Sequence, residues 1–408
     1  MHILYIHQYF ATRSGSTGTR SYEFARRWVK AGHKVTMLTT IAQLTNQDLA
    51  VAKGWLLKRF TIEGIDVLAL AIPYRQQMGV FKRCLAFLAF LLFASVVVLF
   101  LRKVDVVYAS STPLTVGIPA TVLKWLKRVP FIFEVRDQWP AALVKIGFLK
   151  SKFLIGIFTY FEKTIYKYSA AIITVSDGMA EGVREVAGEG KPVYVIPNGS
   201  DLDLFSPDID GSAIRQEKGW NDKIVLVYAG VMGKLDALEF VIDVAKRVRD
   251  YQDILFVLIG PGSDKGNLGR MVEGLGLRNV EILPPVPKQQ LPAILAAADI
   301  VMAIFAKFAF VEKYASLNKF YDGISAGKPV LLNCSGWQRK LLEDNFAGFG
   351  CKLCDVDEFV EKVLYFNSHR DKLIAMGRNA RRIAEEKFDR DKLATQALAQ
   401  IELASGKA

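Results

Sequence analysis

The sequence is poor in the side chains that usually carry metal-ion and nucleophilic chemistry, with four histidines and four cysteines in 408 residues. The scattered cysteines are typical of a reducing compartment. Cys351 and Cys354 form a CxxC pair, but no second pair accompanies it to complete a zinc site, so we expect no metal. Among the histidines, only His7 is well placed for a ligand, and no Ser-His-Asp arrangement is present.

Signals for export and for nucleic-acid binding are also missing. Residues 1–9 lack the basic stretch of a secretory signal, and Ile3–Ile6 is typical of a first strand. No aromatic-basic interleaving or helix-turn-helix pattern accompanies the basic residues, so we expect no nucleic-acid partner.

Charge is unevenly placed along the chain. The net charge is +12, and residues 1–197 hold 25 Lys and Arg against 12 Asp and Glu, whereas residues 198–408 hold 28 against 29. The surplus therefore lies in the first half. It favours an anionic membrane surface or an anionic substrate as the partner of that half.

Strand and helix signals alternate along the chain, which is typical of α/β domains with a parallel sheet covered on both faces. The length favours two domains, and the turn Pro197-Asn198-Gly199 marks their boundary. Two doubly wound halves would place a ligand cleft between the carboxyl ends of both sheets. The predicted strands are Ile3–Ile6, Val35–Leu38, Val67–Ala71, Val104–Ala109, Phe131–Val135, Ala171–Val175 and Val193–Ile196, then Ile224–Tyr228, Ile254–Ile259, Val280–Leu283, Ile300–Ala303 and Val330–Leu332. Two helical segments, about Asp371–Glu386 and Asp389–Leu403, end the chain.

An apolar run of 18 residues, Cys84–Leu101, has no charge and is flanked by basic residues on both sides. Its length is borderline for a membrane span. However, Val67–Ala71 and Val104–Ala109 on either side are predicted in one parallel sheet, and a span would separate them. Two interpretations stay open: a helix buried against the sheet, or a helix that covers the sheet on one face and enters lipid on the other.

Under the second interpretation, a membrane-facing surface includes Phe87, Phe90, Leu91 and Phe93. A second amphipathic candidate, Ile146–Lys167, mixes aromatic residues with lysines. We expect a peripheral, monotopic protein at the cytoplasmic face of the inner membrane.

The segment from Asn318 to Leu331 predicts a helix, a Gly-Lys-Pro stop and a buried strand. Lys319 and Asp322 share one helical face. An ammonium group suits a diphosphate, and a carboxylate suits ribose hydroxyls. The alternative is a solvated ion pair between the two side chains.

Glycine-rich turns follow the first predicted strand of each half. Gly15 and Gly18 precede the first helix, where backbone N–H groups can approach an anion. Gly230 and Gly233 allow the same close approach in the second half, and Lys234 can meet phosphate. The alternative for each is a glycine turn without a ligand.

Two further loops of the second half complete the predicted donor site. Gly260 follows that half's second strand and is placed to border the base. Val286 lies in the rigid loop Pro284–Pro287, whose backbone could contact a base edge.

Three charged residues, Glu134, Arg136 and Asp137, lie at the end of the strand Phe131–Val135. Charges among apolar residues are costly unless they are paired. Arg136 could bind phosphate, and Asp137 could orient an acceptor hydroxyl, with Glu134 behind it. An internal Arg–carboxylate pair is the alternative.

Taken together, these motifs resemble glycosyltransferase family 4, which has the GT-B fold, and most of all its bacterial branch that builds surface polysaccharide and O-antigen units on a polyprenyl-diphosphate carrier. The matching segments are Gly15–Arg20, Asp105–Tyr108, Thr112–Leu114, Glu134–Pro140, Pro197–Gly199, Gly230–Lys234, Pro284–Pro287, Asn318–Val330 and Met376–Asp389.

The resemblance implies retaining transfer from a nucleotide-diphosphate sugar, with UDP expected, to a lipid-linked saccharide and without an essential metal or cofactor. It implies that Gly230, Gly233, Lys234 and Lys319 contact the donor diphosphate. Asp322 falls at the second acid of the family's Glu-x7-Glu motif, and the first falls at Tyr314. The last helix is expected to return to the first domain. That domain would then comprise 1–197 plus about 388–408, with 198–387 as the donor-binding domain.

Two other functions stay open at this stage. One is a nucleotide-sugar epimerase of the GT-B fold, and the other is a membrane-bound nucleotide-sugar sensor or scaffold.

Overall fold

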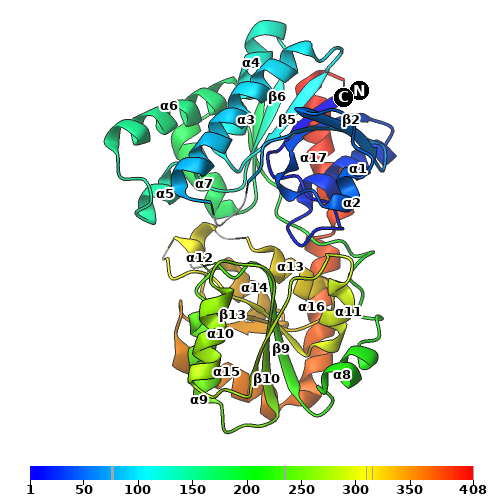
Figure 1. Ribbon diagram of the computed structural model, residues 1–408. Coiled ribbons are helices and arrows are strands. Elements are labelled where there is room, and N and C mark those ends of the chain that lie inside the picture. Colours follow the sequence, from blue (N-terminus) through cyan, green and yellow to red (C-terminus); the bar gives the residue numbers. More distant parts are fainter. Residues whose placement is uncertain (75–77, 234–235, 309, 315, 408) are drawn as a thin grey trace. The chain divides into compact units, whose positions relative to one another are not determined.

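The computed structural model describes residues 1–74, 78–233, 236–308, 310–314 and 316–407. The chain forms two compact units, drawn in Figure 1. Unit 1 comprises Met1–Pro197 and Asp391–Ala408, and unit 2 comprises Asn198–Arg390. Each unit has an open, mainly parallel sheet between layers of helices, which confirms the predicted fold of two doubly wound α/β domains.

Unit 1 contains an eight-stranded sheet in the order β3-β4-β2-β1-β5-β6-β7-β8. Only β3 is antiparallel, and it pairs with β4 as a hairpin that the sequence analysis missed. The strands are β1 (His2–Ile6), β2 (Lys34–Thr40), β3 (Leu57–Ile62), β4 (Ile65–Leu70), β5 (Val106–Ser110), β6 (Phe131–Val135), β7 (Ala171–Thr174) and β8 (Val193–Val195).

Helices cover both faces of this sheet (Figure 1). One layer consists of α3, α4, α6 and α7, and the other includes α1 and α17. The C-terminal helix belongs to unit 1, as expected, because Leu393 and Ile401 pack in its core and Trp28 Nε1 donates to the Ala394 carbonyl at 3.0 Å. The helices are α1 (Arg20–Lys30), α2 (Asn46–Leu49), α3 (Val80–Phe100), α4 (Gly117–Lys127), α5 (Ala141–Lys145), α6 (Lys152–Tyr168), α7 (Asp177–Ala187) and α17 (Arg390–Ser405).

Unit 2 contains a six-stranded parallel sheet in the order β11-β10-β9-β12-β13-β14. Helices α9, α10 and α15 pack on one face, and α11, α13, α14 and α16 pack on the other. The strands are β9 (Ile224–Ala229), β10 (Ile254–Ile259), β11 (Val280–Leu283), β12 (Ile300–Ala303), β13 (Val330–Leu332) and β14 (Gly348–Gly350). Strand β14 was not predicted, since three residues with two glycines carry little strand signal.

The helices of unit 2 vary in length from four residues to 15 residues. They are α8 (Ser212–Lys218), α9 (Glu239–Arg247), α10 (Lys265–Gly274), α11 (Leu291–Ala297), α12 (Val311–Tyr314), α13 (Asn318–Ser325), α14 (Trp337–Asp344), α15 (Val356–Ser368) and α16 (Leu373–Lys387).

Helix α3 is the apolar run identified in the sequence. Within the described residues, Phe81–Phe100 is the one helical stretch long and apolar enough to cross a membrane. It connects β4 to β5, two parallel strands of one sheet, and it contacts β4 and α4. The helix is therefore packed against unit 1 as the crossover connection between these strands.

Only one narrow stripe of α3 faces the protein interior. Ala86, Phe90, Ala94 and Val98 recur every four residues and are buried. Phe90 has no exposed surface, so the prediction that it faces the membrane is wrong. In an apolar helix the sequence carries no polar stripe to show which side faces the sheet.

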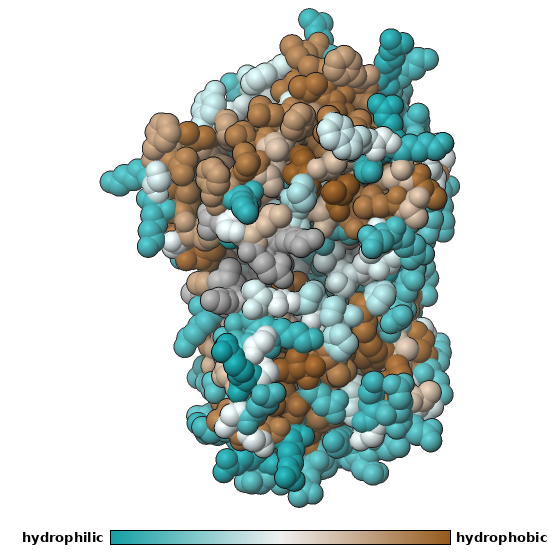
Figure 2. All heavy atoms as spheres, viewed as in Figure 1, coloured by the Kyte–Doolittle hydropathy of each residue, from teal (hydrophilic) through white to brown (hydrophobic). Residues whose placement is uncertain are grey.

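The other side chains of α3 whose burial is described are exposed or partly exposed. Phe93 is 54% exposed, whereas Phe87 and Leu91 are only partly exposed. Apolar residues extend this surface onto α4, α5 and α6, and Figure 2 shows them gathered on this side of unit 1. The exposed apolar residues of this surface are Phe81, Leu85, Leu88, Leu92, Phe93, Val96, Phe100, Trp125, Leu126, Val144, Phe148, Phe153, Leu154 and Tyr160.

Candidate functional site

Lys319 lies at the start of α13, at the carboxyl edge of the unit 2 sheet. Its Nζ lies 4.4 Å from the centre of the Tyr228 ring. Its aliphatic chain crosses Gly230, where an added Cβ would lie 2.1 Å from Lys319 Cε. Glycine at 230 therefore makes room for the lysine. Burial lowers the pKa of Lys319, while Asp236 and Asp322 act in the opposite direction. A dianionic ligand would stabilise the charged form.

Asp322 lies one turn further along α13, and it is buried. Its carboxylate forms an ion pair with Lys288 and accepts a hydrogen bond of 3.3 Å from Ser200 Oγ. The structure thus gives Asp322 a partner that the sequence analysis did not predict. Lys288 follows the proline-rich loop after β11. A lysine at the end of a loop predicted to lie at this sheet edge could have indicated the ion pair.

The glycine loops after β9 and β10 pack closely on each other. The Gly230 N–H donates to the Ile259 carbonyl at 2.9 Å, and a Cβ on Gly260 would lie 1.8 Å from the Gly230 oxygen. The Gly233 N–H donates to Asp236 Oδ2 at 2.9 Å. These glycines therefore serve loop packing in addition to any ligand contact. Lys234 lies outside the described residues.

The proline-rich loop after β11 is partly anchored. Val286 is partly buried and packs against the core of unit 2, whereas Pro284 and Pro285 are exposed. This arrangement leaves the loop at the same carboxyl edge as Lys319 and the glycine loops. Six predicted donor residues of unit 2 thus lie at or beside one edge: Gly230, Gly233, Gly260, Val286, Lys319 and Asp322.

In unit 1, Glu134 is the centre of a buried polar network. Its side chain has no exposed surface and accepts hydrogen bonds from Arg20 Nε at 2.9 Å, Tyr108 Oη at 2.7 Å and Ser110 Oγ at 2.5 Å. Burial alone raises the pKa of Glu134, but Arg20 and Arg136 outweigh it, and the pKa falls to about 2. At neutral pH, Glu134 is therefore a charged partner of Arg20.

Arg20 was missed as a functional residue, although it ends the glycine loop of the sequence motif. It also donates to the carbonyl oxygens of Ile196 and Pro197, at 2.9 and 2.7 Å. The predicted internal Arg–carboxylate pair therefore exists, but with Arg20 in place of Arg136. Through these hydrogen bonds, Arg20 connects the start of α1 to the segment that follows β8.

Asp137 is exposed, and its carboxylate accepts a hydrogen bond from Thr112 Oγ1. The neighbouring Arg136 is held through its backbone N–H, which donates to Ser111 Oγ at 2.9 Å. Since Ser111 and Thr112 follow β5 while Arg136 and Asp137 follow β6, the loops of two adjacent strands orient these groups. Asp137 is the carboxylate here that solvent and ligands can reach.

The loop before α1 lies at the same edge, since it follows β1. Gly15 and Gly18 are partly exposed within it. The loop is fixed by Asp48, which accepts hydrogen bonds from Thr12 and Ser14 at 2.8 and 3.1 Å.

His7 follows directly after β1. It is buried, with Nδ1 at 2.8 Å from Ser21 Oγ. Burial, with Arg136 nearby, lowers the pKa of His7 to about 3, so the ring is neutral. A neutral imidazole at this edge suits hydrogen bonding to a ligand better than charge neutralisation.

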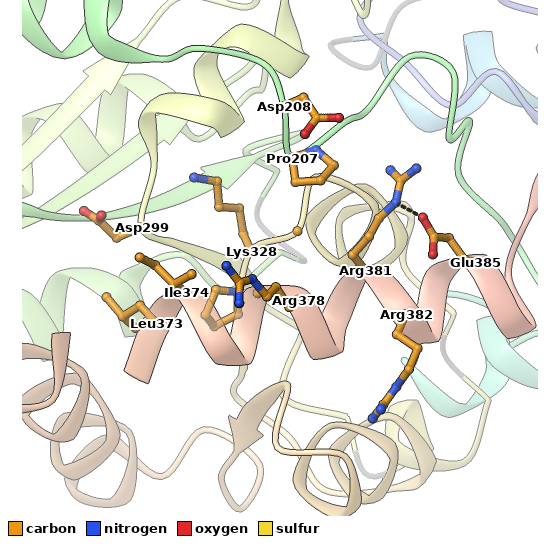
Figure 3. A pocket seen from close by; sticks show the side chains of 13 residues that line it. Pro207, Asp208, Asp299, Lys328, Leu373, Ile374, Arg378, Arg381, Arg382 and Glu385 are labelled. Atoms are coloured by element: carbon orange, nitrogen blue, oxygen red, sulfur yellow. Dashed lines mark hydrogen bonds and ion pairs between the residues drawn. The ribbon is translucent and has the colours of Figure 1, made fainter. Parts of the chain in front are cut away.

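A pocket of about 520 Å³ opens at the opposite, amino edge of the unit 2 sheet, before β12 and β13 (Figure 3). Two of its cations hold the fold together: Lys328 donates to the Ala296 carbonyl at 2.8 Å, and Arg381 bonds Ser325 and Glu385. Among the described residues, none of the predicted site residues lines this pocket, so it lies apart from the donor-site candidates at the carboxyl edge of the unit 2 sheet.

Comparisons with known proteins agree with this architecture. The family model described as Glycosyl transferase 4-like domain matches residues 15–199, and the one described as Glycosyl transferases group 1 matches residues 210–383. Both halves of the chain are glycosyltransferase domains of the GT-B fold. The first match ends at Gly199, the last residue of the Pro197–Gly199 turn, and the second begins at residue 210.

The solved structures that resemble this protein match it over nearly its whole length, whereas a relative found by sequence matches less than half of it. The putative colanic acid biosynthesis glycosyl transferase WcaI of Escherichia coli K12 is 28% identical over 174 residues, 41% of this chain and 42% of that protein. Sucrose-phosphate synthase from Thermosynechococcus elongatus superposes with a TM-score of 0.77 at 14% identity, covering all of both chains. Anabaena Alr3699/HepE, solved with UDP and glucose, gives a TM-score of 0.72 at 17% identity over 98% of this chain and 99% of that one.

Proposed function

We propose that this GT-B protein is a retaining glycosyltransferase. It moves a hexosyl or N-acetylhexosaminyl group from a UDP-sugar to a saccharide carried on polyprenyl diphosphate. The reaction belongs to polysaccharide or O-antigen biosynthesis at the cytoplasmic face of the inner membrane. The observation that carries the proposal is the gathering of Lys319, the glycine loops and Asp322 at one sheet edge of a glycosyltransferase group 1 domain.

In this proposal, unit 2 binds the donor. Lys319 neutralises the diphosphate, because its ammonium group is partly desolvated and would gain from a strong anionic partner. The Asp322–Lys288 pair lies where the ribose binds, so a hydroxyl of the ribose competes with Lys288 for the carboxylate. The proposed chemistry needs no metal, since lysine supplies the positive charge. That UDP and glucose bind HepE supports the choice of donor.

Unit 1 binds the acceptor. Retaining transfer brings the acceptor hydroxyl to the face that the diphosphate leaves, so a departing phosphate oxygen can accept the hydroxyl proton. Asp137 orients the hydroxyl and supports positive charge as it develops on the sugar. Its hydrogen bond from Thr112 fixes the carboxylate for this role. Glu134 contributes by holding Arg20, while Arg136 lies beside the acceptor.

The membrane partner follows from the surface of unit 1. Exposed apolar side chains of α3 and α6 are accompanied by basic residues, among them Lys82, Lys152 and Lys163. An apolar face inserts into the boundary of the bilayer while cations meet anionic headgroups. A lipid-linked acceptor would reach Asp137 without leaving the membrane surface.

The test is release of free UDP from UDP-sugars in the presence and absence of polyprenyl-diphosphate saccharides. We expect release only with the acceptor, and a product whose anomeric configuration equals that of the donor. Conversion of the donor without acceptor would identify an epimerase, and tight donor binding without turnover would identify a sensor. Asp137→Asn should lower turnover about a hundredfold with donor affinity kept, because only acceptor orientation is lost.

A further inference from the structure

Five aromatic rings of unit 1 contact one another in a row. The ring centres are 5.1 Å apart for Tyr9 and Tyr74, 5.9 Å for Tyr74 and Phe87, 6.4 Å for Phe87 and Trp139, and 5.8 Å for Trp139 and Phe158. We name these five residues the aromatic row. All five are partly exposed, so the row is a surface feature that a ligand can reach.

The aromatic row joins elements that are far apart in sequence. Tyr9 and Tyr74 follow β1 and β4, Phe87 lies on α3, and Phe158 lies on α6. Trp139 comes two residues after Asp137, and its backbone N–H donates to the Asp137 carbonyl at 3.0 Å. Trp139, on the loop that carries Asp137, therefore lies in the row between Phe87 of α3 and Phe158 of α6, the two helices that carry the exposed apolar surface.

A cation lies beside the aromatic row. Arg83 precedes Phe87 by four residues on α3, so the two side chains share one face of the helix. The Arg83 guanidinium lies 5.7 Å from the centre of the Phe148 ring. It also acts on the Tyr9 hydroxyl, since Arg83 opposes the rise in the pKa of Tyr9 that burial causes. Arginine suits a phosphate because its planar fork makes two parallel hydrogen bonds.

The placement of Phe87 changes its interpretation. The sequence predicts Phe87 on the membrane-facing surface together with Phe93. In the structure its ring lies between Tyr74 and Trp139, whereas Phe93 is exposed. Phe87 thus belongs to a surface near the proposed acceptor site, and Phe93 belongs to the outer apolar surface.

We propose that the aromatic row and Arg83 bind the isoprenoid diphosphate of the acceptor, an inference that rests on the proposed function for the acceptor's lipid carrier. The isoprenoid chain packs along the rings, and Arg83 binds the diphosphate. A chain of methyl-branched, unsaturated units offers C–H groups and double bonds to ring faces, which favours such contacts. The saccharide beyond the diphosphate then lies toward Asp137, at the end of the loop that carries Trp139.

The test is calorimetric titration of the whole protein, kept in detergent, with farnesyl diphosphate, farnesol and inorganic diphosphate. We expect farnesyl diphosphate to bind more tightly than either of the others, since only it fills both parts of the site. Tyr74→Ala and Phe87→Leu should weaken farnesyl diphosphate binding about tenfold, by loss of ring contacts. Arg83→Ala should weaken farnesyl diphosphate binding and leave farnesol binding unchanged.

Leu92→Ser and Phe93→Ser are the matched controls, since both residues are exposed on α3 outside the row. They should reduce sedimentation with anionic vesicles and leave farnesyl diphosphate affinity unchanged. The inference is overturned if the row variants, shown to be folded by thermal melting, bind farnesyl diphosphate normally. It is also overturned if row and control variants lose vesicle binding equally, because the row would then contact ordinary bilayer lipid.

The two proposals can fail separately. If the wild-type protein binds farnesyl diphosphate through the row but transfers no sugar to any lipid-linked saccharide, the proposed function is wrong. If it transfers sugar to such acceptors while the row variants keep wild-type affinity for farnesyl diphosphate, the inference about the row is wrong.

Discussion

The Arg20 guanidinium and the Glu134 carboxylate form an ion pair of 2.8 Å in the interior of unit 1, where neither side chain is more than 1% exposed. The pair joins the first turn of α1 to the end of β6. Tyr108 and Ser110 complete the hydrogen bonding of the carboxylate. Buried charges of this kind hold a specific arrangement of elements, and the loss of one partner leaves the other uncompensated.

Glu134→Ala is therefore expected to destabilise the protein by about 3–5 kcal/mol, because Arg20 would remain buried without its counter-charge. Denaturant unfolding followed by circular dichroism measures this change. Glu134→Gln keeps the shape of the side chain and should lose less. A variant with unchanged stability and lost turnover would instead make Glu134 a catalytic group.

The contact of Lys319 with Gly230 gives a prediction about donor affinity. Lys319→Ala should weaken UDP-sugar binding by about 2 kcal/mol, since it removes a charge-assisted contact. Gly230→Ala should have an effect in the same direction, because a methyl group there would displace the lysine. Calorimetry with UDP measures both. Normal UDP affinity in both variants would show that Lys319 is not a donor ligand.

Asp322→Asn separates a ribose contact from a structural ion pair. The carboxylate is buried and paired with Lys288, so its loss should lower thermal stability as well as donor affinity. The matched variant Lys288→Met removes the other partner. If Asp322→Asn melts like the wild type but binds UDP weakly, the carboxylate acts on the ligand alone.

The outer face of α3 gives a prediction about membrane binding. Leu92→Ser together with Phe93→Ser should move protein from membrane to soluble fractions without unfolding it, since each exposed side chain inserted into lipid contributes about 2 kcal/mol. Phe90→Ser is the contrasting variant, because a buried phenylalanine supports the fold and its loss should lower stability. Release of the wild type by salt alone would show that charge, without insertion, accounts for attachment.

Glu162 on α6 predicts a pH dependence of stability. Burial raises the pKa of Glu162 to about 7, above its usual value near 4.5. The folded state therefore binds a proton more tightly than the unfolded state. The stabilisation from this group is complete below about pH 4.5 and is lost as pH rises toward 7. Glu162→Gln should thus raise the melting temperature at pH 8 more than at pH 5. An equal shift at both pH values would contradict the assignment.

The alternation of buried runs and helical segments determined the fold class from sequence, because parallel strands buried on both faces leave continuous apolar runs. The sequence also predicted that Lys319, Gly230 and Gly260 lie at one edge of the unit 2 sheet, since the loops after parallel strands meet at the carboxyl edge. It failed for β3 and β14, where an antiparallel hairpin and a glycine-rich strand carry weak signals.

Only the tertiary structure decided which charges are partners and which apolar faces are open. Arg20 and Glu134 lie 114 residues apart, and their pairing depends on the order of strands in the sheet. Likewise, Phe90 and Phe93 are the same residue type on one apolar helix. Only the packing of α3 within unit 1 buries Phe90 and leaves Phe93 exposed. Local sequence fixes the period of a helix, whereas the direction in which that helix faces depends on its neighbours in the fold.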